Sequence, residues 1–139
     1  MQVTFIRNAR EVAQHWHEAG PMLAPVATEA ARGEFDLGDL ERLTASGKAV
    51  TALVHDDEGK PAMALVFEFV HYPRRYGINV VACGGSGLDR MLDRFMLDFR
   101  MWASQAGAEF LEASCSRAMA RMLQRHGFDI EYQVVRSAL

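Results

Sequence analysis

The sequence predicts a mixed α+β fold in which a mainly antiparallel sheet is flanked by helices. Alternating apolar runs separated by turn residues follow one another between residues 50 and 83, which is typical of a meander of three antiparallel strands. An amphipathic helix then lies between two extended runs, and this strand–helix–strand order predicts a parallel pair. The expected order of elements is β-α-α-β-β-β-α-β-α-β.

The first third of the chain is predicted to be mostly helical. A short β-prone run, Val3–Ile6, comes first, and Asn8 is a suitable N-cap for the helix that follows. Gly20-Pro21 is expected to interrupt that helix, because proline lacks the N–H that a helix interior needs. A second helical piece is expected over Met22–Ala31 and a shorter one before Ser46-Gly47.

The middle of the chain changes from helical to alternating periodicity. The acidic run 56–59 ends in glycine and predicts the first turn, and residues 73–75 begin with proline and predict the second. The three expected strands are Val50–Val54, Ala62–Val70 and Tyr76–Cys83.

The helix after this meander has the strongest pattern in the sequence. Its apolar residues recur at the spacing of one buried face and are Met91, Leu92, Phe95, Met96, Phe99 and Trp102. Gly107 suits the left-handed position just past a helix. A stripe of this kind predicts a core helix.

Three further elements are expected in the last third. Glu109–Ser114 reads as a short strand parallel to Tyr76–Cys83. Arg117–His126 is expected to be helical and to end at Gly127. The alternation in Asp129–Val135 predicts a last strand.

Length and composition predict one domain over residues 1–139, because half of the residues are hydrophobic and the chain is too short for two ordinary domains. The formal net charge of −3 gives no electrostatic basis for binding nucleic acid or an anionic membrane. Cys83 and Cys115 are too few for a disulfide framework and are not spaced for a metal site. No segment approaches the ~20 apolar residues that span a bilayer. A reducing, cytoplasmic location is expected.

The turn between the third meander strand and the long helix is a candidate anion site. Gly84-Gly85-Ser86-Gly87 joins them, and the first turn of a helix leaves about four backbone N–H groups without partners. Glycines allow positive φ and close approach of a ligand, so a side chain at Gly85 is expected to obstruct an anion. Ser86 is a candidate cap. The alternative is a tight turn without a ligand.

The order of elements resembles that of the GNAT family, the acyl-CoA-dependent N-acetyltransferases. The resemblance covers nearly the whole chain and is most specific at Val80–Leu97 and at Ala118–Phe128, which ends in Gly-Phe. It implies that acetyl-CoA binds at the glycine turn. The implied coenzyme-binding residues are Val81, Ala82, Cys83, Gly84, Gly85, Ser86, Gly87, Leu88 and Ser116.

The sequence departs from the family pattern at two positions. Ala82 stands where the family usually has Gln or Arg, and Leu123 stands where a tyrosine often protonates the departing thiolate. Ser116 lies near the usual position of an asparagine. These departures imply weak activity or a changed function.

Three residues near the end of the second meander strand are candidates for proton transfer. Glu68 lies in an apolar run, where desolvation would raise the pKa of its carboxyl group, and His71 and Tyr72 follow it. The alternative is an outward-facing Glu68 and two solvated turn residues. A basic stripe on the predicted late helix suits a coenzyme phosphate or an acidic partner, although most such stripes are solvated faces; it consists of Arg117, Arg121 and Arg125.

Two functions follow from these patterns. The first is acetyl-CoA-dependent transfer of an acetyl group to a small amine or a protein amino group. The second is a non-catalytic GNAT-like protein that acts through contacts with a protein partner, such as a virion-associated component of a bacteriophage. The sequence leaves open whether the chain forms a homo-oligomer.

Overall fold

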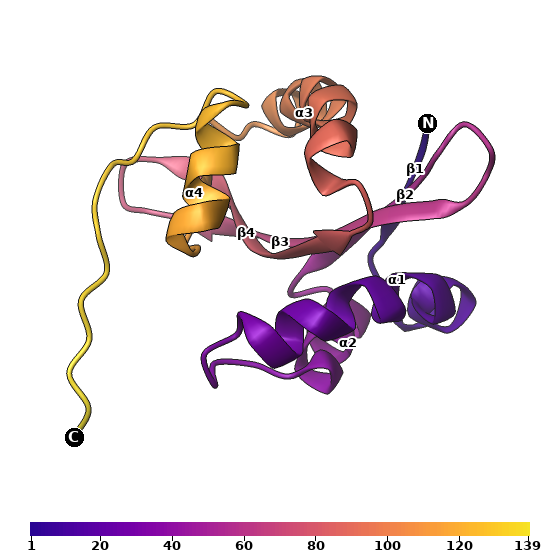
Figure 1. Cartoon of the computed structure of the whole chain (residues 1–139), viewed down its shortest axis with the longest axis horizontal. Coiled ribbons are helices and arrows are strands. Elements are labelled where there is room, and N and C mark those ends of the chain that lie inside the picture. The colour runs from indigo at the N-terminus through magenta and orange to yellow at the C-terminus, as the bar shows by residue number, and fades with distance from the viewer.

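The computed structural model describes residues 1–139 as one five-stranded sheet with helices on both faces. Helices α1 and α2 cover one face, and α3 and α4 lie on the other (Figure 1). The elements are β1 (Gln2–Ile6), α1 (Ala9–Glu29), α2 (Leu37–Ala45), β2 (Val50–His55), β3 (Pro61–His71), β4 (Tyr76–Gly85), α3 (Leu88–Gln105), β5 (Leu111–Ala113) and α4 (Arg117–Gln124). The mixed α+β fold predicted from the sequence is confirmed.

The strands follow chain order across the sheet, from β1 to β5. The pairs β1–β2, β2–β3 and β3–β4 are antiparallel, as the meander predicts. The β4–β5 pair is parallel and joins Ile78 to Leu111, Asn79 to Glu112 and Val80 to Ala113. The strand–helix–strand prediction for this part of the chain is therefore confirmed.

The first helix is longer than the sequence predicts. The expected break at Gly20-Pro21 is wrong, because α1 continues through both Pro21 and Pro25 to Glu29. Each internal proline removes a helical hydrogen bond and costs about 3 kcal/mol. The helix continues past both prolines with its apolar face, which includes Val12, Ala19 and Leu23, buried against the sheet. The predicted cap is confirmed, since the Asn8 side chain accepts a hydrogen bond from the Glu11 N–H at 2.9 Å.

The core has two layers, one on each face of the sheet. The layer under α3 is rich in aromatic and Met side chains and includes Met63, Leu65, Phe67, Ile78, Leu92, Phe95 and Phe99. The layer under α1 and α2 is aliphatic and includes Ile6, Leu23, Leu40, Leu53, Val66 and Ala82. The predicted core stripe of α3 is confirmed apart from Trp102, which is half-buried.

The last predicted strand is wrong. Residues 129–135 pair with no strand, and residues 129–139 are exposed. An extended segment becomes a strand only when a neighbour takes its N–H and C=O groups, and this segment runs outward beyond α4 (Figure 1). Arg136 of this segment pairs with Glu34, which lies between α1 and α2.

Candidate functional site

The turn between β4 and α3 leaves the start of α3 without a side-chain cap. Gly87 is the N-cap residue, with a φ of 64°, and no side chain accepts a hydrogen bond from the first turn. Ser86 therefore does not cap this helix, contrary to the expectation. The Met91 N–H makes the first helical bond, to the Gly87 carbonyl at 3.1 Å. The amides before Met91 have no carbonyl within the helix to bind, so they can bind an anion.

The three glycines of the turn have different structural roles. A Cβ atom at Gly84 would lie 2.2 Å from the Met22 carbonyl of α1, and one at Gly85 would lie 2.2 Å from the Ala62 carbonyl of β3. A side chain at Gly85 would therefore collide with the sheet, which corrects the expectation that it would point into the path of an anion. At Gly87 a Cβ atom would meet nothing within 4 Å. Gly87 is the glycine that faces open space.

Strand β4 extends past the end of β5 next to this turn. Their pairing ends at Val80, whereas β4 continues to Gly85. The β3–β4 register shifts between Val66 and Phe67, which leaves Val81 without a partner in β3. The segment 81–85 of β4 thus has a neighbouring strand on its β3 side only. This unpaired edge of β4 leads directly to the uncapped start of α3.

The side chains of the predicted coenzyme residues lie on both faces of β4. Ala82 is buried in the layer under α1, and Cys83 packs against the layer under α3. The Cys83 thiol is buried although the residue as a whole is half-buried, and this burial raises its pKa to about 12. Leu88 packs at the edge of the same layer, and Ser116 caps α4 by accepting a hydrogen bond from the Met119 N–H at 3.2 Å. A thiol with this pKa stays protonated at neutral pH.

A row of polar residues crosses three neighbouring strands on the face opposite α3. The register pairs Glu68 of β3 with Asn79 of β4, and Asn79 with Glu112 of β5. The Asn79 Nδ2 donates a hydrogen bond to Glu68 Oε1 at 3.2 Å. All three residues are half-buried, and neither carboxylate forms an ion pair. These carboxylates lie close to the unpaired edge of β4, where they can accept protons.

Tyr72 extends this row, whereas His71 does not. The Tyr72 hydroxyl donates a hydrogen bond to Glu112 Oε1 at 2.6 Å, which together with Tyr132 raises the pKa of Tyr72 to about 12. Alternation along β3 places His71 on the α3 face, where its ring lies 4.6 Å from the Tyr76 ring. Sequence reasoning missed Glu112; a charged residue in the middle of a short apolar strand was its only signal.

Polar contacts join the end of α4 to the first turn of α3. The Asp89 carboxylate accepts hydrogen bonds from His126 Nε2 and Arg125 Nη2, each at 2.9 Å, and these two contacts lower its pKa. His126 Nδ1 also lies 3.2 Å from Asp93, and only 4% of the His126 side chain is exposed. Of the predicted basic stripe, Arg125 thus meets an acidic partner within the chain. Arg125 and His126, which follow α4, therefore lie beside the uncapped first turn of α3.

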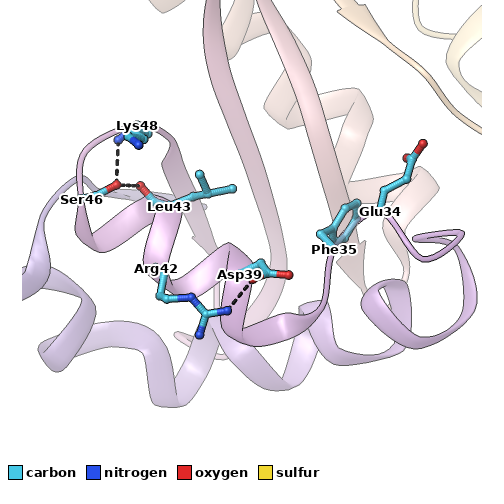
Figure 2. Close-up of a pocket in the computed structure, with 7 residues that line it drawn as sticks. All are labelled: Glu34, Phe35, Asp39, Arg42, Leu43, Ser46 and Lys48. Atoms are coloured by element: carbon cyan, nitrogen blue, oxygen red, sulfur yellow. Dashed lines mark hydrogen bonds and ion pairs between the residues drawn. The ribbon is translucent and has the colours of Figure 1, made fainter.

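A cavity lies away from this turn, at α2. It has a volume of about 550 Å³ and is lined by Glu34, Phe35, Asp39, Arg42, Leu43, Ser46 and Lys48. Figure 2 shows that Arg42 points to Asp39 and that the Ser46 hydroxyl lies between the Leu43 carbonyl and the Lys48 N–H. Asp39 also belongs to the capping box at the start of α2. Asp39, Arg42 and Ser46 thus have their partners within α2 and the residues next to it, where they stabilise the helix and its ends.

The described residues contain no group of three or more His, Cys, Asp and Glu side chains able to hold a metal ion. None of the helices combines the length and the hydropathy that crossing a membrane requires.

No protein-family model and no curated protein matches the sequence. Solved structures do match the fold. A structure described as "a probable acetyltransferase" has a TM-score of 0.73 at 12% identity and covers 100% of this chain and 97% of that chain. An aminoglycoside antibiotic 6'-N-acetyltransferase from Acinetobacter baumannii has a TM-score of 0.66 at 13% identity, over 99% and 98% of the two chains.

A GNAT family acetyltransferase from Staphylococcus aureus gives a TM-score of 0.65 at 10% identity and covers 100% of each chain. At identities this low the likeness establishes the fold and not the activity. The chain therefore has the GNAT acyl-CoA N-acyltransferase fold, as the order of its elements indicates.

Proposed function

We propose that this protein is an acetyl-CoA-dependent N-acetyltransferase that acts on an amine. The observation that carries the proposal is the uncapped start of α3 beside a segment of β4 that has a neighbouring strand on one side only. The first feature suits a phosphate group, and the second suits an extended chain that carries amide groups. Coenzyme A has both, in its pyrophosphate and in its pantetheine arm.

The coenzyme-binding residues in this proposal lie along one continuous path. The backbone of Gly85, Ser86, Gly87 and Leu88 binds the pyrophosphate, and the edge of Val81–Cys83 binds the pantetheine amides. Gly87 leaves the space in front of the turn free of side-chain atoms. Arg121 lies one turn before Arg125 on α4 and forms no ion pair, so it is free to bind a phosphate oxygen.

The acceptor amine approaches from the face of the sheet opposite α3, where Glu68, Asn79 and Glu112 lie. When bound, acetyl-CoA supplies an activated acetyl group at the edge of β4 beyond the end of β5. An amine is nucleophilic only after it has lost its proton, and Glu68 or Glu112 accepts that proton. Tyr72 orients Glu112 through its hydroxyl group. His71 lies on the other face and has no direct part in this step.

We expect turnover to be slow. Leu123 gives α4 no hydroxyl group to protonate the departing thiolate, and a positioned acid typically contributes 10²–10⁴-fold in rate. Ala82 likewise offers no polar side chain to the coenzyme, and it is buried under α1.

A matched pair of variants at Ser86 tests the proposal. Ser86 is exposed and its backbone φ is not positive, so both Asp and Asn fit there. Calorimetric titration with acetyl-CoA should give a dissociation constant about tenfold weaker for Ser86→Asp than for Ser86→Asn, because only Asp places a negative charge beside the bound phosphates. Release of the coenzyme thiol in the presence of a panel of amines measures turnover.

The alternative function makes the opposite prediction for the same measurements. A non-catalytic protein that acts through protein contacts would show no coenzyme binding and no thiol release. A ligand at one hundred times its dissociation constant stabilises the folded state by about 2.7 kcal/mol, so unchanged thermal unfolding at millimolar coenzyme A would contradict the proposed function. Equal affinities of Ser86→Asp and Ser86→Asn would place the coenzyme elsewhere.

A further inference from the structure

The proposed reaction gives no role to a buried histidine, His126, that lies just past the end of α4. Only 4% of its side chain is exposed. Its Nε2 lies 2.9 Å from Asp89 Oδ1, and its Nδ1 lies 3.2 Å from Asp93 Oδ1. Both carboxylates belong to α3. Each ring nitrogen of this histidine therefore faces an acidic side chain of the neighbouring helix.

These two contacts bear on how many protons the ring carries. A neutral imidazole has one N–H group and one nitrogen lone pair, whereas an ionised carboxylate only accepts hydrogen bonds. With a neutral ring, either Asp89 or Asp93 would face a lone pair. Only the imidazolium offers an N–H group to both carboxylates, and such charge-assisted contacts are stronger than neutral ones. The geometry therefore fits a positively charged His126.

Other charged groups face His126 from α3 and from the end of α4. Arg125, the preceding residue, donates a hydrogen bond to Asp89 Oδ2 at 2.9 Å. Arg100 of α3 donates a hydrogen bond to the His126 backbone carbonyl at 2.6 Å, so this guanidinium contacts the backbone. Asp93 forms no ion pair besides that with His126. Two carboxylates thus meet Arg125 and the ring, and loss of the ring proton leaves Asp93 without a cationic partner.

The position of these contacts connects them to the proposed coenzyme site. Asp89 lies in the first turn of α3, whose free amides suit a phosphate group. A carboxylate without a cationic partner close to that turn would repel an anion. No residue of α4 is buried, so its attachment to α3 depends strongly on polar contacts. The charge of His126 therefore affects both the attachment of α4 and the electrostatics of the turn.

We propose that His126 is a proton-dependent clamp between α4 and α3. With both ring nitrogens protonated, it binds Asp89 and Asp93 and holds α4 beside the first turn of α3. As the pH rises, one ring proton passes to water, Asp93 loses its partner and α4 loosens. The consequence for the ligand rests on the proposed function: coenzyme A, an anion, binds more tightly while His126 is protonated.

NMR and hydrogen exchange of the coenzyme-free protein test the clamp itself. Histidines change charge between about pH 5 and 8, and the contacts of Asp89 lower its pKa, which keeps that carboxylate ionised over the range. The His126 ring should show two N–H groups at about pH 5.5 and one at about pH 8. Between these values the protection factors of the α4 amides should fall about two- to tenfold, while those of α3 stay almost unchanged.

A matched pair of variants separates the clamp from other effects of pH. Asp93→Asn removes the carboxylate that faces Nδ1, and Asp98→Asn makes the same change at a residue of α3 that forms no ion pair. The response of α4 to pH should shrink in Asp93→Asn and persist in Asp98→Asn. His126→Gln should abolish it. Asp93 is exposed, so Asp93→Asn keeps the test valid if His126→Gln does not fold.

Calorimetric titration with coenzyme A tests the consequence for the site. The phosphate monoester of the coenzyme titrates in the same pH range, so each variant is compared with the unmodified protein at both pH values. From about pH 5.5 to about pH 8, the dissociation constant should rise about three- to tenfold more in the unmodified protein than in His126→Gln or Asp93→Asn. Asp98→Asn should behave as the unmodified protein does.

Three results would overturn the clamp or its effect on the site. A ring with a single N–H group at about pH 5.5 would show that His126 is neutral there. An equal response of α4 to pH in the unmodified protein and in Asp93→Asn would remove the clamp. The same pH dependence of coenzyme affinity in all variants would disconnect it from the site. Absence of coenzyme binding at either pH would instead contradict the proposed function, and the coenzyme-free measurements would still decide the clamp.

Discussion

Helices α3 and α4 lie on the same face of the sheet (Figure 1), and both have an apolar stripe in their sequences. The stripe of α3 is buried and comprises Met91, Leu92, Phe95, Met96, Phe99 and Ala103. No residue of α4 is buried, and Met119, Ala120, Met122 and Leu123 are half-buried at most. Two similar patterns have thus produced one core helix and one peripheral helix.

The difference comes from what lies beneath each helix. Helix α3 packs on β3 and β4, whose long strands supply Phe67 and Ile78 to the shared core. The sheet ends at β5, which is three residues long. Polar contacts hold α4 instead: those of Asp89, and a hydrogen bond of 2.6 Å from Arg100 to the His126 carbonyl. Burial of an apolar stripe depends on the area of sheet available to it.

The largest expected effect is the loss of an aromatic ring from α3. Phe95→Ala should lower the free energy of unfolding by about 3–5 kcal/mol, because Phe95 is 1% exposed and the deletion leaves a cavity. Met122→Ala on α4 should lower it by roughly 1 kcal/mol, since that side chain is only half-buried. Urea unfolding of both variants measures the difference. Equal losses would contradict the comparison between the helices.

A smaller effect should follow from removing the carboxylate that joins the two helices. Asp89→Asn should speed hydrogen exchange of the α4 amides about two- to tenfold and leave those of α3 almost unchanged, because local opening of α4 becomes easier. Asp98→Asn is the control, since Asp98 lies on α3 and forms no ion pair. Faster exchange over both helices would show that they open as one unit.

The same contact should depend on pH. The hydrogen bond from His126, and then that from Arg125, lowers the pKa of Asp89 below its ordinary value of 3.8. A lowered pKa in the folded state stabilises the fold above pH 3.8, and this contribution is lost as the pH falls through the folded pKa. Protection of the α4 amides should therefore decrease first on acidification. In Asp89→Asn this decrease should be absent.

The smallest expected effect lies at the edge of the sheet near α4. The Tyr72 pKa of about 12 exceeds its ordinary value of 10.0, so the protonated hydroxyl stabilises the fold below pH 10 and this contribution is lost between pH 10 and about 12. Ultraviolet titration of tyrosine should show a late step that Glu112→Gln shifts to lower pH. Glu109→Gln, an acidic neighbour without a bond to Tyr72, should leave that step in place.

The candidate site shows where sequence reasoning reached its limit. The glycine turn and the strand and helix around it follow from local patterns, and all three are where the sequence places them. The row formed by Glu68, Asn79 and Glu112 depends on register between strands far apart in the chain. No spacing within the sequence encodes that register. The coenzyme and proton-transfer roles of these residues stay predictions.

By itself the sequence determined the order of helices and strands as far as α4, because each element depends on periodicity, caps and turn residues within a short stretch of chain. It also predicted a break in α1 and a last strand, neither of which the structure contains. Tertiary structure decided the rest. It kept α1 intact through Pro21, since burial of its apolar face outweighs a lost hydrogen bond. It made Gly84 and Gly85 packing positions, and it left residues 129–135 unpaired because a strand exists only beside a partner.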